Sequence, residues 1–430
     1  MMDQAGVLGA ALERIRTSPR IADDFAALCA CGGRFAGTPS EARAREFLAT
    51  RAAEAMGTAV RRHRVAYRGW TRGPASVRAA DGRLFPALGL VRTPSVPEGV
   101  TGRLVDAGRG TPEDIARAGA AVRGGIVLVR HEYMVGTGHV HRRRKYDAAR
   151  AAGAAGFLIA CHEPGELPVT GSSGDGGAGH IPAAGISRET GAILAASGGE
   201  VTLTTAGEFA DSTAENLIAS LPGAGPTRVV LSAHYDGHDP AASAIDNASG
   251  VVAAIAVAEA LRDAVPTLPR GLDLALFTVE EWALIGSRSY LAELDPAARE
   301  AIAFNVNLDS VAGGARLTAI TGGFPGVADF VTRTAAISGL RLGIHHGFMA
   351  NSDHANFVAQ GIPALRLCAG FDEPGSNLRY LLTAADTPDK VRVEEIKAAA
   401  SAAAALVVAA CSEPDIPARV SPEEGRRIVG

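Results

Sequence analysis

Apolar runs that end abruptly in charged residues are the main feature of this sequence. The clearest run is V-V-L-S-A-H-Y-D-G-H-D-P-A-A-S-A-I-D-N-A-S-G, residues 229–250, which opens with a short continuous apolar segment. Such a segment is typical of a strand buried on both faces. It stops at His234, and further polar residues follow within twelve positions: Asp236, His238, Asp239 and Asp246. Open α/β sheets place ligand crevices at the carboxyl ends of their strands, so this pattern predicts a ligand site.

Two later segments end in the same way. G-L-D-L-A-L-F-T-V-E-E (271–281) predicts a strand that ends in Glu280 and Glu281, and A-I-A-F-N-V-N-L-D-S (301–310) predicts another that ends at Asp309. Any one of these acids alone could be a cap or a loop residue. Three strands that bring His234, the glutamates and Asp309 to one sheet edge instead predict a shared site. From Ser249 onward the chain is apolar on almost every side, which indicates a buried helix against the sheet.

The first part of the chain predicts helices followed by a strand. Residues 1–20 have the pattern of a short amphipathic helix, and residues 40–57 have the pattern of a helix with Ser40 as its cap and Gly57 as its end. Residues 60–67, V-R-R-H-R-V-A-Y, mix β-forming and basic residues, so we expect an exposed strand there.

Residues 69–207 differ in texture, with frequent Gly and Pro and short predicted strands. Residues 124–130 predict a strand, 145–156 a helix ended by Gly and 157–160 a second strand, which together form a βαβ-like unit. We therefore divide the chain into residues 1–68, the N-terminal part of the main domain; 69–207, an inserted domain; and 208–430, the rest of the main domain. A length of 430 residues is also more than one simple core accommodates.

Composition restricts the function further. The chain is 47% hydrophobic and 20% charged with a formal net charge of −4, which argues against a general attraction to nucleic acid or to anionic lipid. The five cysteines are scattered and form no C-x-x-C pair, so we expect buried, reduced thiols. We see no secretory signal pattern and no uninterrupted apolar run of about 20 residues. These features lead us to expect a cytoplasmic protein that does not bind membranes; they leave the oligomeric state open.

The clustered residue types suit metal-dependent hydrolysis. Amide hydrolysis needs a polarised carbonyl and a nucleophile near neutral pH, and bound zinc supplies both. One carboxylate must stay off the metal to accept the proton of water. Adjacent Glu280 and Glu281 fit that division, because neighbouring side chains at a strand end point in different directions. Asp236, two residues after His234, is placed to hold the imidazole.

The ordered motifs resemble the zinc aminopeptidase family, which includes Streptomyces-type and Aeromonas-type aminopeptidases, glutamate carboxypeptidase and glutaminyl cyclase. The matching motifs are H-Y-D (234–236), D-N-A-S-G (246–250), E-E (280–281), N-L-D (307–309), S-D-H-A-N-F (352–357), G-I-P (361–363) and T-A-A-D-T-P-D-K-V (383–391). Residues 100–205 also resemble the protease-associated domain, a small module inserted in peptidases; an unrelated small α/β insert is the alternative.

This resemblance implies an α/β fold with a mixed, largely parallel sheet sandwiched by helices, plus a small α/β or β-rich insert. It also implies a zinc site in which His234 and Asp309 hold one ion, Asp246 bridges, Glu281 holds a second ion and Glu280 is the base. A non-proline cis peptide after Asp246 is a further implication.

One position departs from the family. Its last motif normally reads His-Thr-x-x-Asp-Thr, and that His ligates the second metal, but here Leu382 takes its place. We consider three outcomes: a single zinc at His234, Asp246 and Asp309; a replacement ligand; or loss of hydrolytic activity. The candidates for a replacement ligand or a pocket residue are His354, His238, His345 and His346.

A dense basic run, H-V-H-R-R-R-K (139–145), lies in the insert. It is either a solvated loop before a helix or a substrate-binding element in which Arg142, Arg143 and Arg144 grip a substrate carboxylate. For the whole chain, the leading hypothesis is an aminopeptidase or dipeptidase acting on small peptide or amide substrates. The alternatives are a specialised amidohydrolase or cyclising acyltransferase, and a non-catalytic binding protein on the same scaffold.

Overall fold

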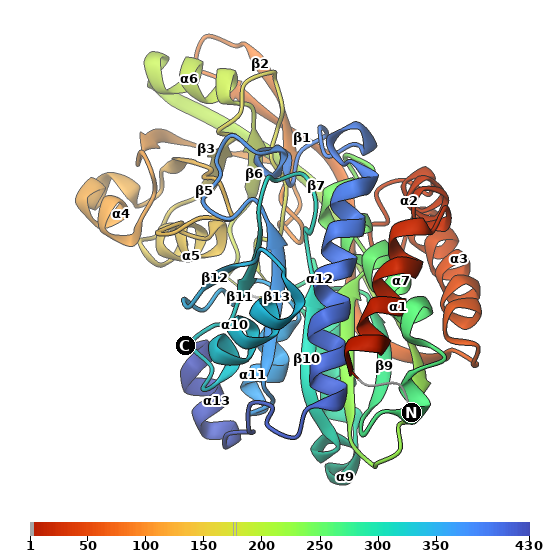
Figure 1. Cartoon of the computed structure of the whole chain (residues 1–430). Coiled ribbons are helices and arrows are strands. Elements are labelled where there is room, and N and C mark those ends of the chain that lie inside the picture. The colour runs from red at the N-terminus through yellow and green to blue at the C-terminus, as the bar shows by residue number, and fades with distance from the viewer. Residues whose placement is uncertain (1–3, 175, 178) are drawn as a thin grey trace.

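The computed structural model describes residues 4–174, 176–177 and 179–430. Figure 1 shows a large part, in which helices pack on a sheet, and a smaller part that lies above it at the upper left. The helices of the larger part are α1 (Gln4–Thr17), α2 (Arg20–Ala30), α3 (Pro39–Met56), α7 (Ser249–Leu261), α8 (Ile285–Glu293), α9 (Pro296–Glu300), α10 (Val327–Ser338), α11 (His354–Ala359), α12 (Val393–Ser412) and α13 (Pro422–Val429).

The main sheet is mixed and largely parallel, as the family resemblance implies. Its strands follow the order β7 (Glu200–Leu221), β9 (Gly271–Phe277), β8 (Arg228–His234), β10 (Ile302–Leu308), β13 (Ala364–Ala369), β11 (Leu317–Ile320) and β12 (Gly343–His345). The central pairs β9–β8, β8–β10 and β10–β13 are parallel, whereas β7–β9 and β11–β13 are antiparallel. The three strands predicted to end in charged residues are therefore neighbours that run in one direction.

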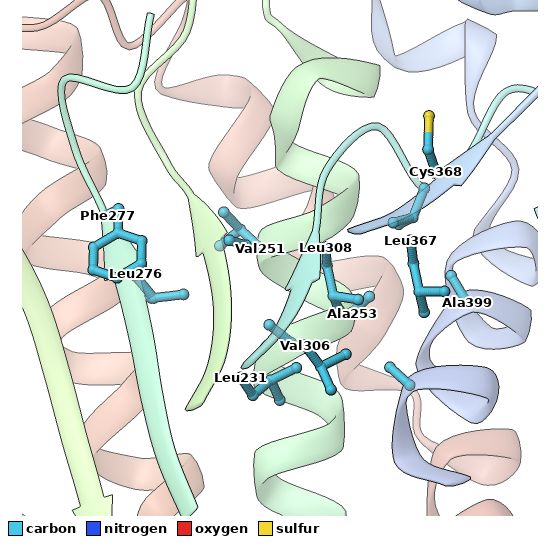
Figure 2. Packing of buried hydrophobic residues seen from close by; sticks show 14 of the residues in the cluster. Leu231, Val251, Ala253, Leu276, Phe277, Val306, Leu308, Leu367, Cys368 and Ala399 are labelled. Atoms are coloured by element: carbon cyan, nitrogen blue, oxygen red, sulfur yellow. The ribbon is translucent and has the colours of Figure 1, made fainter. Parts of the chain in front are cut away.

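Helices cover the sheet because its central strands are apolar on both faces. Helices α7 and α12 pack on β8 and β10, and α1 packs on α7 and α12 (Figure 1). Figure 2 shows Val251 and Ala253 of α7 beside the strand residues Leu231, Val306 and Leu308. Successive side chains of a strand point to opposite faces of the sheet, so other helices cover the second face. There the ring of Phe277, at the end of β9, packs against Tyr290 of α8 and Phe357 of α11, with 5.6 and 6.2 Å between ring centroids.

The smaller part contains β1 (Arg61–Ala79), β2 (Leu84–Gly89), β3 (Val96–Asp106), β4 (Ile126–Arg130), β5 (Gly156–Ala160) and β6 (Ala183–Ile186), with α4 (Pro112–Ala118), α5 (Arg142–Ala151) and α6 (Arg188–Ser197). Strands β3, β4, β5 and β6 form successive parallel pairs. The predicted βαβ unit is therefore β4–α5–β5. Strands β1 and β7 pair in antiparallel fashion from Arg61↔Ile218 to Ala79↔Val201 and so run from the main sheet into the insert.

Two of the local predictions for this part of the chain need correction. The expected exposed strand at 60–67 is part of the longer β1, and its alternate side chains, such as Val65, are buried against the fold because β7 pairs with it. The cap of α3 is Thr38, whose hydroxyl accepts a hydrogen bond from the amide of Glu41, and Pro39 takes the first helical position. The amphipathic helix expected in the N-terminal segment is α1, with Val7 and Ile15 on its buried side, and residues 1–3 lie outside the described part.

Two segments pass a length-and-composition test for a membrane-spanning helix, Ala244–Leu261 and Val393–Ser412. In these, 89% and 72% of the tested residues are buried inside the protein, so burial in the core accounts for their apolar character. All five cysteines are free, and Cys29, Cys161, Cys368 and Cys411 are buried, as expected for thiols that serve as core residues.

Burial of α7 predicts a large difference between two matched substitutions. Ile255 in α7 is 1% exposed and Ile337 in α10 is 75% exposed. Ile255→Ala should lower the free energy of unfolding by about 2–5 kcal/mol, because it removes transfer energy and leaves a cavity. Ile337→Ala should change it by less than about 0.5 kcal/mol in the same urea titration. Equal losses in both variants would contradict this assignment of the core.

Candidate metal centre and active site

The carboxyl ends of β8 and β10 bring an imidazole and two carboxylates together. His234 is the last residue of β8, Asp309 directly follows β10, and Asp246 lies in the turn before α7. His234 Nε2 lies 3.1 Å from Asp246 Oδ1 and 3.7 Å from Asp309 Oδ1. One ligand atom from each of the three side chains falls within 4.8 Å of the other two, a spacing that allows them to share one ion.

Hydrogen bonds to the backbone fix the position of Asp246. The amides of Ile245 and Asp246 donate to the two carboxylate oxygens of Asp386 at 2.7 and 3.2 Å. The Asn247 side chain donates to the carbonyl of Leu308 and accepts from the amide of Ser310, which ties this turn to the end of β10. The Asp246–Asn247 peptide is cis, as the resemblance implies.

Asp236 holds the glutamates in place more than it holds the imidazole. Its carboxylate accepts hydrogen bonds from the amides of Glu280 and Glu281 at 3.1 and 3.3 Å. Its backbone carbonyl lies 3.1 Å from Nδ1 of His234, whereas its carboxylate is 3.7 Å from that nitrogen. The role expected from the sequence is thus shared between two groups of Asp236, and the carboxylate fixes the loop that follows β9.

Glu280 and Glu281 lie in different electrostatic environments. Burial, reinforced by the nearby charges of Glu281 and Asp353, raises the pKa of Glu280 well above its usual value, although His234 opposes the shift. Burial would also raise the pKa of Glu281, but His238 outweighs it and lowers that pKa. His238 Nε2 lies 2.8 Å from Glu281 Oε2. Glu280 can therefore hold a proton, while Glu281 is held as a carboxylate.

The group fits a divalent cation on three grounds. Its donors are an imidazole nitrogen and carboxylate oxygens, which suit zinc. Asp246 Oδ1 is buried and lies 3.1 Å from His234 Nε2, but neither this contact nor any other among the described residues has the geometry of a hydrogen bond. Several buried carboxylates of like charge surround one imidazole, an arrangement that is costly without a compensating positive charge.

A positive side chain already compensates part of that charge. Arg366 of β13 is 3% exposed, and its Nη2 lies 3.2 Å from Asp309 Oδ1. Burial alone would raise the pKa of Asp309, but the charge of Arg366 and contact with His234 lower it. Asp309 is therefore ionised and available as a ligand.

On the side of the site near Leu382, Asp246 and Glu281 are two carboxylates without a histidine ligand as the third member among the described residues. Leu382 lines the cavity as an apolar side chain. His238 lies on this side but is paired with Glu281 and falls outside the three-residue ligand group. His354 is buried against the ring of Phe348, 5.4 Å between ring centroids, and is not among the residues that line the cavity.

The centre opens into a cavity of about 930 Å³ that is lined from both parts of the molecule. The main domain contributes His234, Asp246, Glu280, Glu281, Asp309 and His345, and the insert contributes Arg142, Arg143 and Arg144. The first turn of α5 therefore places the basic run at the cavity. Arg142 is buried, Arg143 pairs with Asp147 at 3.4 Å, and Arg144 is exposed, so the three arginines have different environments.

Three residues of the site were missed or left without a role by the sequence analysis. Arg366 is the one charge in the apolar run A-L-R-L-C-A, and that charge was the available signal. Asp386 and Asp353 stood in recognised motifs, but no role followed for them. Burial raises the pKa of each to about 7, although His234 opposes the rise at Asp353 and the amide of Ile245 opposes it at Asp386. Neither oxygen of Asp353 has a hydrogen-bond partner among the described residues.

Comparison with known proteins agrees with this geometry. Residues 216–407 match peptidase family M28, and residues 100–194 match the PA domain. The main domain belongs to peptidase family M28. The insert is a PA domain, which confirms the resemblance given for both parts of the chain.

Solved structures of this kind share the fold. An aminopeptidase from Aneurinibacillus sp. strain AM-1 aligns with a TM-score of 0.72 at 24% identity, over 96% of this chain and 98% of that one. A zinc aminopeptidase from Bacillus subtilis gives 0.71 at 24% identity with the same coverage. A peptidase M28 precursor from Shewanella amazonensis gives 0.80 at 21% identity, over 97% of this chain and 99% of that one.

Sequence relatives cover less of their own length. A probable leucine aminopeptidase 2 from Arthroderma benhamiae is 31% identical over 243 residues, which are 53% of this chain and 48% of the relative. A probable lipoprotein aminopeptidase, LpqL, from Mycobacterium tuberculosis is 31% identical over 222 residues, 50% of this chain and 42% of the relative. The chain thus spans about half the length of the curated relatives it matches.

The ligand group predicts stabilisation by a divalent cation. Added zinc should raise the thermal midpoint of protein that has been dialysed against a chelator. The free energy of unfolding should rise by about 2.7 kcal/mol when free zinc is 100 times its dissociation constant. His234→Ala should abolish this rise, because it removes the nitrogen ligand of the group. A rise of equal size in His234→Ala would place the bound ion elsewhere.

The contacts of Asp386 predict a loss that a nearby aspartate does not share. Asp386→Asn replaces one of two accepting oxygens by a donor that faces an amide, so stability should fall by about 1–3 kcal/mol. Zinc affinity should fall about 10–100-fold, because the turn that holds Asp246 is no longer fixed. Isothermal titration with zinc measures the second effect. Asp389→Asn, at an exposed position in the same segment, should change neither quantity.

Proposed function

We propose that this protein is a zinc-dependent aminopeptidase that hydrolyses small peptide or amide substrates. The observation that carries the proposal is the group of His234, Asp246 and Asp309 beside the buried acid Glu280 on one cavity. The M28 family of the main domain and the names of the relatives, leucine aminopeptidase and zinc aminopeptidase, support the same activity.

The chain's own residues divide the work. Zinc held by His234, Asp246 and Asp309 would polarise the substrate carbonyl and lower the pKa of water. Glu280 accepts the proton of the attacking water and passes it to the leaving amine, so it must be able to hold that proton between the two steps. Its raised pKa suits this task. Asp236 keeps Glu280 in reach by accepting the hydrogen bond of its amide.

Leu382 favours one alternative within the same chemistry. Because Leu382 stands where a histidine would be the third ligand on this side of the site, a specialised amidohydrolase or cyclising acyltransferase with one metal remains the second candidate. Release of p-nitroaniline from amino-acid p-nitroanilides supports the aminopeptidase. Turnover confined to N-blocked amides, or conversion of an N-terminal glutaminyl peptide to a cyclic product, supports the second candidate.

The five free cysteines favour a reducing compartment, and we propose a cytoplasmic location on that ground. Fractionation of the producing cells, followed by immunodetection, tests it. Recovery of the protein in the extracellular or membrane fraction would contradict it.

Glu280→Gln tests the role of the base. The variant should lose roughly two or more orders of magnitude in kcat, because the amide cannot accept the proton. It should keep its zinc, since Glu280 is outside the ligand group. Kinetics on amino-acid p-nitroanilides and metal analysis of the same preparation measure both properties.

Glu300→Gln is the matched control, because the Glu300 side chain is 75% exposed on α9. It should keep both kcat and zinc content. Wild-type protein that binds zinc but turns over no peptide or amide substrate would support a binding protein on this scaffold and overturn the proposed hydrolase.

A further inference from the structure

Arg142 of the PA domain lies beside the half of the metal centre where Leu382 stands. Arg142 is 5% exposed, and its Nη1 is buried without a hydrogen-bond partner among the described residues. It lines the same cavity as Glu281, Asp246 and Leu382. A buried guanidinium with an unsatisfied N–H is costly, so it requires a compensating partner in that cavity.

A short segment, residues 170–172, which we call the strap, links Arg142 to Leu382 by hydrogen bonds. The amide of Thr170 donates to the carbonyl of Leu382 at 2.8 Å, and Arg142 Nε donates to the carbonyl of Ser172 at 3.0 Å. Gly171, between these two, has a φ of +116° and lies directly under the guanidinium, so that a Cβ there would collide with it. The strap therefore fixes the guanidinium close to the position of Leu382.

The charges on this side also match. Glu281 Oε2 pairs with His238, but Glu281 Oε1 is buried with no hydrogen-bond partner in the described part of the chain. Burial lowers the pKa of Arg142 to about 10. The negative charge of Glu281 partly offsets this effect, because it stabilises the charged guanidinium. The guanidinium thus stays charged at neutral pH, and it lines the cavity together with Glu281 on the side where Leu382 stands in the place of a histidine.

We propose that Arg142 supplies the second positive charge of this active site, so that the enzyme works with one metal ion and one guanidinium. The ion belongs to His234, Asp246 and Asp309, and Arg142 contacts the oxygen of the substrate that lies on the Leu382 side. The inference rests on the proposed function for its kinetic consequences. Its prediction of metal content is independent of activity.

Metal content is the first test. Wild-type protein that has been equilibrated with zinc and desalted should hold one zinc per chain by plasma mass spectrometry. Leu382→His should still hold one, because Arg142 occupies that side. Leu382→His combined with Arg142→Ala should hold two, through Asp246, Glu281 and the new histidine. Two tightly bound ions in the wild type, or one ion in the double variant, would overturn the proposal.

Kinetics is the second test. Arg142→Ala should keep one zinc and lose at least about 100-fold in kcat/KM, and excess zinc should not restore it. Arg142→Lys should recover part of this loss because it keeps the charge. Arg150→Ala, on the same helix and outside the cavity lining, is the control and should behave as wild type. The thermal midpoint of each variant shows whether it is folded. If Arg142→Ala is not folded, the comparison of Arg142→Lys with wild type is the test.

The two proposals fail in distinguishable ways. No zinc and no turnover in the wild type would overturn the proposed function. Turnover with two ions, or full activity in folded Arg142→Ala, would overturn the role of Arg142 and leave the hydrolase in place.

Discussion

Mutual repulsion among buried carboxylates is the constraint on which this site depends. Asp246, Glu280, Glu281 and Asp309 gather around His234 at the end of the central strands, where Glu280 and Asp309 are buried and the side chains of Asp246 and Glu281 are mostly covered. Each would take up a proton, or the group would move apart, unless positive charge is supplied. Arg366 supplies it beside Asp309, and His238 supplies a hydrogen-bonding partner for Glu281. The remaining negative charge near His234 and Asp246 is what makes this position attractive to a divalent cation.

The scaffold keeps these repelling groups in place by backbone hydrogen bonds. Asp386 holds the turn of Asp246 through two amides, and Asp236 holds the loop of the two glutamates through two more. Gly250, at the start of α7, allows this helix to approach the turn, because a Cβ there would collide with the Asn247 side chain and the Leu308 carbonyl. The position of the ligands is thus set by packing of α7 on the sheet, which the apolar sequence of that helix provides.

Sequence patterns predicted the elements that rest on local signals. Continuous apolar runs located β8, β9 and β10, and their shared direction explains why His234, Asp309 and the glutamates meet at one edge. Patterns did less well where tertiary contacts decide. The cap of α3 is Thr38 because Pro39 starts the helix, and the strand at 60–67 is half-buried because β7, about 150 residues later, pairs with it.

Side-chain direction was the other limit of the sequence. His354 and His238 were equivalent candidates by residue type, yet one packs on Phe348 and the other pairs with Glu281. The motif alone contains no information on which way either ring turns. Similarly, the basic run at 139–145 offered three equal arginines. Only the packing of α5 against the strap at 170–172 separates a buried Arg142 from its more exposed neighbours.

The connection between the insert and the main domain determines whether Arg142 can keep a fixed position at the active site. An inserted domain on flexible linkers could not hold a guanidinium at a fixed position in a site of the main domain. Here β1 and β7 pair from Arg61↔Ile218 to Ala79↔Val201, with one irregularity between Arg72 and Ala75, so one ribbon connects the main sheet to the insert. Arg72 of that ribbon pairs with Asp239 in the loop after β8 and donates to the hydroxyl of Thr170. The segment that fixes Arg142 is therefore anchored to the loop that follows His234, and a shift of the insert would move both ends of the site together.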